Sequence, residues 1–197
     1  MLWNRSLVMI DSETGSLWSH LLGQAMQGTL AGKQLEAIPA EMLTWKAWRL
    51  KHPQTSVLNL SRTHRAYDRA FYRDPGQFVL GWIVDGQPYS ASMAVLKKSP
   101  VLNVRHEKTA SVVTFEEGST AALLFSRTLD RRELRFTALP EGKMKDDATG
   151  STWSRATGTA LDGPLKGKQL KQQVGIMSYA EAWKTFHPDS RIISKSE

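Results

Sequence analysis

The sequence predicts a mainly β protein of antiparallel hairpins and a meander, with one short helix in each of two related repeat copies. Three observations predict this class: a duplicated segment, a series of short apolar runs separated by turn residues, and an ordinary globular composition. The 197 residues are 41% hydrophobic and 23% charged, which suits one large domain or two small ones. The chain has no cysteine, so it can form neither disulfides nor thiolate ligands.

The duplicated segment recurs at an offset of 135 residues. Asp11-Ser-Glu-Thr-Gly-Ser-Leu-Trp-Ser19 returns as Asp146-Asp-Ala-Thr-Gly-Ser-Thr-Trp-Ser154. Without any gap, 19 of the 48 positions from Asp11 to Leu58 are identical to those of the second segment. The identities are chiefly glycines, tryptophans and turn residues, which fix backbone geometry and fill cores. We therefore expect two copies of one structural unit.

The two copies differ in what precedes them. About 65 residues, from Phe78 to Lys143, come before the second repeat motif and have no counterpart before the first. We expect residues 1–60 to be the C-terminal portion of an incomplete first copy, 61–77 a linker and 78–197 a complete second copy. A methionine start inside a strand-like pattern indicates a truncated gene or an N-terminal half encoded elsewhere. Residues 1–60 are expected to dock on the second copy through an exposed strand.

Turn and capping residues predict the elements of the first copy. Leu2 to Ile10 is expected as one strand, Ser12 to Gly15 as a turn and Ser16 to Ser19 as the returning strand. A further extended run is expected from Gln34 to Ile38. A short helix follows, with its N-cap and its stop signal at Thr44 and Pro53.

In the second copy, Asp85-Gly86 between apolar runs is the clearest hairpin signal, because both residues suit a type I′ turn. Ser178-Tyr-Ala-Glu181 has the pattern of a capping box ahead of the helix. Between these, four apolar runs separated by turn residues are typical of an antiparallel meander. They are Val101 to His106, Ser111 to Phe115, Ala121 to Arg127 and Leu134 to Ala138.

The repeat carries a series of motifs in a fixed order. Asp-x-x-Thr-Gly-Ser-x-Trp-Ser is followed by Gly-x-Ala, Gly-x-Leu-x-Gly, Thr-Trp-x-x-Trp and His-Pro, between Asp11 and Pro53. This order resembles the bacterial and archaeal family called domain of unknown function 3179. The resemblance implies a β-rich protein, often of two copies, the first of which contains a Cys-Pro-Leu-Cys-type stretch. The corresponding place in the complete copy of this chain is Phe115 to Ala122, which has no cysteine.

The polar and aromatic residues repeated in both copies are the candidate binding residues. An Asp seven residues before a Trp fits a turn whose carboxylate accepts backbone N–H groups while the indole packs across the hairpin. A His before a Pro fits a helix C-terminus, where a cationic imidazole is favoured. We expect these residues to be fold determinants first and ligand contacts second: Asp11, Trp18, His52, Asp146, Trp153 and His187.

No catalytic residue, metal ligand or cofactor is predicted. His20, His64 and His106 lack a spacing that would place two of them on one helix face. The sequence has no nucleophile elbow, P-loop or dinucleotide fingerprint. The net charge of +7 permits attraction to nucleic acid, but interspersed acidic residues leave no strong nucleic-acid signal. No apolar run approaches the roughly 18 to 20 residues that span a bilayer.

Two classes of function stay open at this point, and with them the question of enzymatic activity. The favoured class is a noncatalytic binding or interaction module, at the cell surface if a longer gene supplies a secretion signal. The alternative is a fragment of an enzyme, or of a metal or thiol protein, whose reactive residues lie in an absent N-terminal copy. Docking of that N-terminal copy is the partner interaction we expect.

Overall fold

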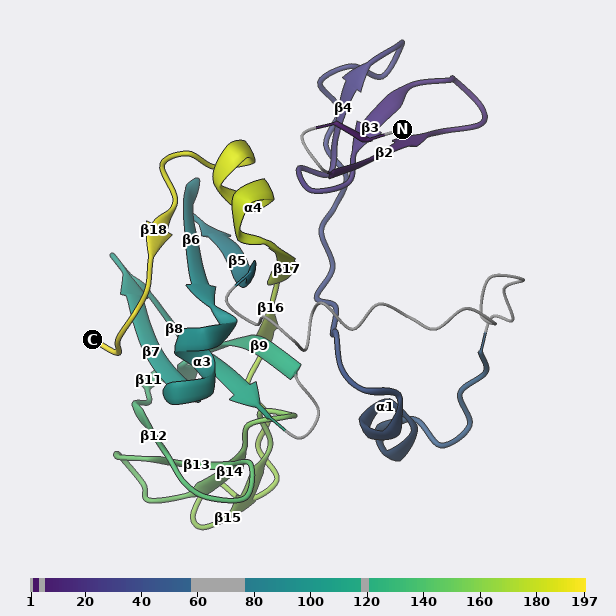
Figure 1. The fold of residues 1–197 in the computed structure, drawn as a ribbon. Helices are drawn as coiled ribbons and strands as arrows, with labels where there is room; N and C mark the ends of the chain where they lie inside the picture. Colours follow the sequence, from purple (N-terminus) through teal and green to yellow (C-terminus); the bar gives the residue numbers. More distant parts are fainter. Residues whose placement is uncertain (1, 4–5, 58–76, 118–120) are drawn as a thin grey trace.

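The computed structural model describes residues 2–3, 6–57, 77–117 and 121–197 (Figure 1). The described part is mainly antiparallel β-structure with a few short helices, as the sequence predicts. Apart from Gln77, the expected linker lies outside the described residues, and so does the basic, aromatic run from Arg62 to Arg73. The division into residues 1–60, 61–77 and 78–197 stays a prediction. Residues 118–120 of the Phe115 to Ala122 stretch also lie outside the described part.

The first copy folds into a four-stranded sheet. In order its strands are β1 (Leu2–Trp3), β2 (Ser6–Ile10), β3 (Leu17–Ser19) and β4 (Gln24–Gln27). The single strand expected from Leu2 to Ile10 is wrong, because β1 turns back and pairs with β2, placing Leu2 opposite Leu7. This pairing satisfies the edge of β2. The extended run expected from Gln34 to Ile38 gives one bridge, Gln34 to Gln24, since no strand of the described part lies beyond it to pair with.

Each copy has a helix at the predicted place. Helix α1 (Trp45–Lys51) begins at Thr44, whose hydroxyl accepts a hydrogen bond from the Ala47 N–H, and none of its residues is buried. Helix α4 (Ala180–Phe186) begins after Tyr179, which makes no side-chain cap. The capping box predicted from Ser178 is therefore wrong. Ser178 still belongs to strand β17 (Ile176–Tyr179), and its hydroxyl bonds the Tyr179 carbonyl oxygen.

The second copy begins with the predicted hairpin of β5 (Phe78–Val84) and β6 (Gln87–Ser92). Asp85 and Gly86 both have positive φ, 49° and 78°, which confirms the type I′ turn. This hairpin lies in a sheet of order β17-β5-β6-β18, in which β18 (Arg191–Ile192) runs parallel to β6. Helix α3 (Met93–Lys98), which the sequence analysis did not predict, follows with Ser92 as its N-cap.

Three of the four runs predicted as a meander pair with one another and form the central sheet. The fourth, Leu134 to Ala138, was wrongly placed in the meander, because its strand pairs within the repeat sheet of the second copy. The strands of the central sheet are β7 (Val101–His106), β8 (Thr109–Glu116) and β9 (Ala121–Ser126), with β16 (Gln172–Gln173) beside β9. A small hairpin follows, formed by β10 (Thr128–Leu129) and β11 (Arg132–Glu133). The repeat sheet of the second copy comes next, with strands β12 (Phe136–Ala138), β13 (Lys143–Asp146), β14 (Thr152–Ser154) and β15 (Ala160–Asp162).

The central sheet is buried on both faces. Leu102, Val113 and Leu124 pack in one cluster with β5, β6 and α3. Their neighbours along the strands point the opposite way, because side chains alternate across a strand. Val112 and Phe125 accordingly pack in a second cluster with the β12–β15 sheet. The second copy therefore has three layers, which Figure 1 shows with the central sheet between the other two.

The first copy docks on the second through side chains. Leu21 is buried in a cluster with Val79 and Trp183 of the second copy. The Trp3 ring meets the Phe186 ring edge-on at a centroid distance of 4.9 Å. Docking through an exposed strand is wrong for the described residues, because the β1–β4 sheet pairs with no strand of another sheet. The contacts come instead from the side chains of Leu21, in the loop between β3 and β4, and of Trp3 in β1.

Substitution of Gly81 by alanine tests the packing of α4 on β5. A Cβ atom at Gly81 would lie 2.5 Å from the Trp183 ring, which is fully buried. We expect Gly81→Ala to lower the free energy of unfolding by about 1–3 kcal/mol, because overpacking forces the indole to move. Ile83→Ala, at a half-exposed position of the same strand, is the control and should change it by less than about 0.5 kcal/mol. Urea denaturation followed by tryptophan fluorescence measures both, and equal losses would contradict the packing argument.

Candidate functional site

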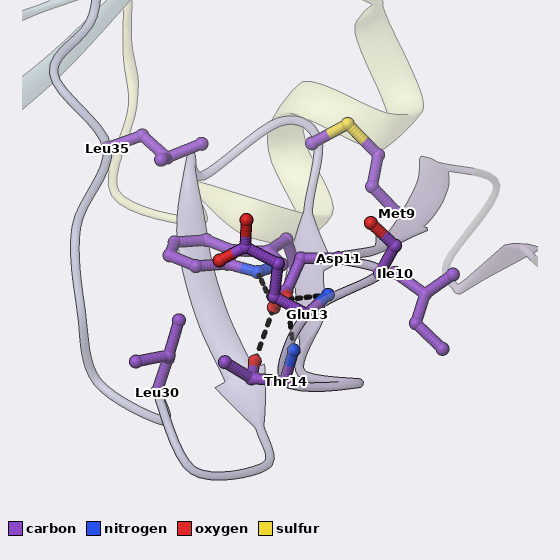
Figure 2. Close-up of a pocket in the computed structure, with 9 residues that line it drawn as sticks. Met9, Ile10, Asp11, Glu13, Thr14, Leu30 and Leu35 are labelled. Atoms are coloured by element: carbon purple, nitrogen blue, oxygen red, sulfur yellow. Dashed lines mark hydrogen bonds between the residues drawn. The ribbon is translucent and has the colours of Figure 1, made fainter.

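The Asp11 carboxylate closes the turn between β2 and β3. One of its oxygens, Oδ1, accepts hydrogen bonds from the backbone N–H groups of Glu13 and Thr14, at 3.1 and 2.7 Å. The other, Oδ2, accepts from the Thr14 hydroxyl at 2.6 Å and from the Trp18 indole N–H at 3.2 Å. Figure 2 shows these donors converging on the carboxylate. The sequence pattern predicted the backbone contacts, and the direct bond from the indole is an addition.

The second copy repeats this network. Asp146 accepts from the Thr149 N–H at 2.6 Å and from the Thr149 hydroxyl at 2.8 Å. It also accepts from the Trp153 indole N–H at 2.9 Å. The difference is exposure, because Asp146 is fully buried whereas Asp11 is partly exposed. The same three residue types, Asp, Thr and Trp, thus build the same turn in a buried and in a partly exposed position.

A serine in each turn fixes the loop that follows β4 or β15. The hydroxyls of Ser16 and Ser151 accept hydrogen bonds from the Leu30 and Leu165 N–H groups, at 3.2 and 3.0 Å. At Gly163 a Cβ atom would lie 2.7 Å from the Ser151 Cα, and φ is +90°, so only glycine fits. The repeated Ser and Gly therefore hold a leucine-bearing loop against the turn.

The Asp11 carboxylate is an ionised acceptor. Hydrogen bonds, first of all the one from the Thr14 hydroxyl, lower the pKa of Asp11 from 3.8 to about 2. A carboxylate that is ionised at neutral pH and bonded by four donors has no proton to give as a general acid. Its geometry suits closing a turn, because each oxygen already accepts two hydrogen bonds from within the turn.

His52 and His187 end α1 and α4, but the imidazoles do not cap the helices as the sequence analysis expected. In both, the backbone N–H donates to the carbonyl oxygen of the preceding tryptophan at 2.8 Å. The imidazole lies over the indole instead, at centroid distances of 4.0 Å from Trp48 and 4.2 Å from Trp183. Burial lowers the pKa of His187, so the neutral form is favoured there. A cationic cap at His187 is therefore wrong, because the ring packs on an apolar surface.

At each helix end a hydroxyl group, which the sequence did not reveal, accepts a hydrogen bond from the tryptophan. The indole N–H of Trp48 donates to the Thr55 hydroxyl at 2.9 Å, and that of Trp183 donates to the Ser190 hydroxyl at 2.8 Å. Thr55 and Ser190 are related by the same offset of 135, but they differ in residue type. Comparing hydroxyl-bearing residues as one class would have found them.

The turns and the helix ends are separate features. Among the described residues, no hydrogen bond, ion pair or ring contact joins Asp11 to His52 or Asp146 to His187. That part of the chain also contains no group of three or more His, Asp or Glu residues placed to hold a metal ion. The six predicted residues therefore do not form one site.

A cavity of about 540 Å³ opens beside the Asp11 turn. Its apolar wall consists of five residues, of which Ile10 has a lysine as its counterpart in the second copy. We define the open face as the other four: Met9, Trp18, Leu30 and Leu35. Figure 2 shows the labelled residues of this face around the Asp11 carboxylate. Leu35 is 47% exposed, and the polar side chains of Asp11, Glu13 and Thr14 form the rim. The sequence did not reveal this face, because identical apolar residues at one offset do not show which copy is covered by another layer.

The counterparts of the open face lie inside the core of the second copy. At an offset of 135 they are Met144, Trp153, Leu165 and Leu170, the same four residue types. Met144 and Trp153 are 0% exposed and Leu170 is 1% exposed. They pack against Val112 and Phe125 of the central sheet. The cavity in the first copy thus lies where the second copy places the central sheet.

The fold and these two sites define a class: a two-copy β-repeat protein in which repeated polar residues close turns and one copy keeps an open apolar face. The chain belongs to the family described as protein of unknown function (DUF3179), whose model matches residues 1–77 and 73–190. This confirms the resemblance seen in the sequence, and the two matched segments fit two related copies. No curated protein and no solved structure matches the chain. None of the helices among the described residues has the length and apolarity needed to cross a membrane.

Substitution of the two turn carboxylates tests the effect of burial. In Asp146→Asn the amide N–H₂ faces the Trp153 indole N–H in one orientation and the Thr149 backbone N–H in the other, so a donor is left unsatisfied in both. We expect a loss of about 1–3 kcal/mol in the free energy of unfolding. Asp11→Asn should cost less, because water reaches the partly exposed turn. Urea denaturation of both variants measures the difference, and equal losses at the two positions would contradict it.

The pH dependence of stability tests the burial of His187. Because the folded state lowers its pKa below the ordinary 6.5, the unfolded state binds more protons near that pH. The contribution of His187 is therefore complete above its unfolded pKa and is lost as the pH falls below it. His187→Gln should reduce the fall in urea midpoint between about pH 7.5 and about pH 5.5. His52→Gln, at the exposed counterpart, is the control, and the same reduction in both variants would contradict the prediction.

Proposed function

We propose that this chain is a noncatalytic interaction module whose first copy binds a partner protein through the open face. The observation that carries the proposal is the contrast between the copies. All four side chains line a cavity in the first copy, and two of them, Met9 and Leu35, are clearly more exposed than their core counterparts Met144 and Leu170. An apolar patch with a polar rim is the usual anatomy of a protein interaction site.

Burial of the open face by a partner protein would lower the free energy, because apolar side chains would be removed from water. Removing a leucine or methionine side chain from water contributes about 1.5–3 kcal/mol. Leu35 is about half exposed, and the Met9 and Leu30 side chains are partly exposed, so each has contact area left to bury. The Asp11 network holds the indole in place by hydrogen bonds, so little order has to be gained at Trp18 on binding.

The six predicted residues take different parts in this proposal. Asp11 and Trp18 border the open face and are the proposed ligand contacts. Asp146 and Trp153, which are fully buried, serve the fold of the second copy. The remaining two, His52 and His187, end helices and lie on indole rings.

Binding of an apolar dye tests the proposal. We expect bis-ANS to bind the chain with an increase in fluorescence, and Leu35→Asp to weaken that binding about tenfold by placing a charge on the open face. Leu161→Asp is the matched control, because Leu161 is similarly exposed, at 43%, but lies on β15 of the second copy. Both variants should keep the wild-type melting temperature. Equal dye affinity of the two variants would contradict the open face as a binding surface.

A further inference from the structure

We infer that the partner is a polypeptide with a hairpin and meander of the β5–β9 type, which packs on the first copy as β5–β9 pack on the second. This inference rests on the proposed function and names the occupant of the open face. Three surfaces of the first copy support it, and each has a counterpart that β5–β9 already cover within this chain.

The first surface is the open face itself. In the second copy, Val101, Val112 and Phe125 of the central sheet cover the four counterpart side chains. The open face has the same four residue types, with Met9 and Trp18 on strands and the two leucines in the segment after the last strand, on a sheet of the same strand order. The interface between the central sheet and β12–β15 is therefore the model for how the partner's meander would pack on the open face.

The second surface is a free backbone segment. In the second copy, Gln172 and Gln173 form β16 and pair with Phe125 and Leu124 of β9. Their counterparts Ala37 and Ile38 are exposed and belong to no strand. Unpaired extended backbone next to an apolar face is suited to adding a strand from a partner. A meander on the open face would bring its last strand beside Ala37 and Ile38.

The third surface is the helix. Trp183 and Ala182 of α4 are buried, and the indole packs against Val79 and Gly81 of β5. Their counterparts in α1 are Trp48 and Ala47, and α1 has no buried residue. Figure 1 shows α1 apart from the β1–β4 sheet, at the end of an extended run. A hairpin like β5–β6 would give this helix the surface that α4 has.

A titration with a surrogate partner tests the inference. The probe is the polypeptide of residues 78–135 of this sequence, added to the full chain with bis-ANS bound. We expect it to displace the dye and to slow amide hydrogen exchange in β2, β3 and residues 37–38. Leu35→Asp should weaken its binding about tenfold, and Leu161→Asp should leave it unchanged.

The outcomes separate the two proposals. If the dye binds at the open face and a soluble probe neither displaces it nor protects these amides, the inference fails and the proposed function stands. If the dye does not bind at the open face, the proposed function fails as well. If the chain alone sediments as a dimer with these amides protected, a second copy is the occupant, and the inference of a separate partner is overturned.

A fused variant keeps the test decisive if the probe aggregates. In this variant residues 78–135 are joined directly to Met1. This reproduces the order of the second copy, in which residues 78–135 lead into Phe136, the counterpart of Met1. We expect dye binding to be lost and the emission of Trp18 and Trp48 to shift to shorter wavelength. In the fused variant Leu35→Asp should lower the melting temperature, as it does not in the original chain. A folded fusion that still binds the dye, with exchange unchanged in β2 and β3, would overturn the inference.

Discussion

The packing of one apolar sheet face against another is the constraint on which this structure depends. A four-stranded repeat sheet has one face of apolar side chains, and a second layer that covers this face stabilises it by removing the side chains from water. The central sheet supplies that layer to the second copy, because alternate residues of β7, β8 and β9 point to opposite faces and both faces are apolar. Only one such meander is present among the described residues, and it serves one of the two copies.

The polar repeat makes each sheet a preformed unit. A carboxylate, a threonine, a serine and a tryptophan share hydrogen bonds within one turn, and the serine also holds the leucine loop. These contacts are local in sequence, so they form in both copies regardless of what covers the sheet. The first copy consequently keeps its shape around Asp11 although the open face has no layer over it.

The sequence predicted most strands and both repeat helices, because turn residues and apolar alternation act over a few residues. The hairpin at Asp85-Gly86 and the Thr44 cap are of this kind. The misses have tertiary causes. Ser178 does not cap α4 because β17 must extend through Tyr179 to pair with β5. The cationic role expected for His187 fails because its imidazole is packed on Trp183.

The sequence by itself determined that two copies exist and that their turns have equal geometry, since identical short-range hydrogen bonds follow from identical residues at one offset. It also contained the four matched apolar pairs, from Met9 with Met144 to Leu35 with Leu170. Only the tertiary structure decided that Met144 and Leu170 are core whereas Met9 and Leu35 stay accessible. The physical reason is that burial depends on contacts from residues distant in the chain, and the central sheet lies against one copy alone.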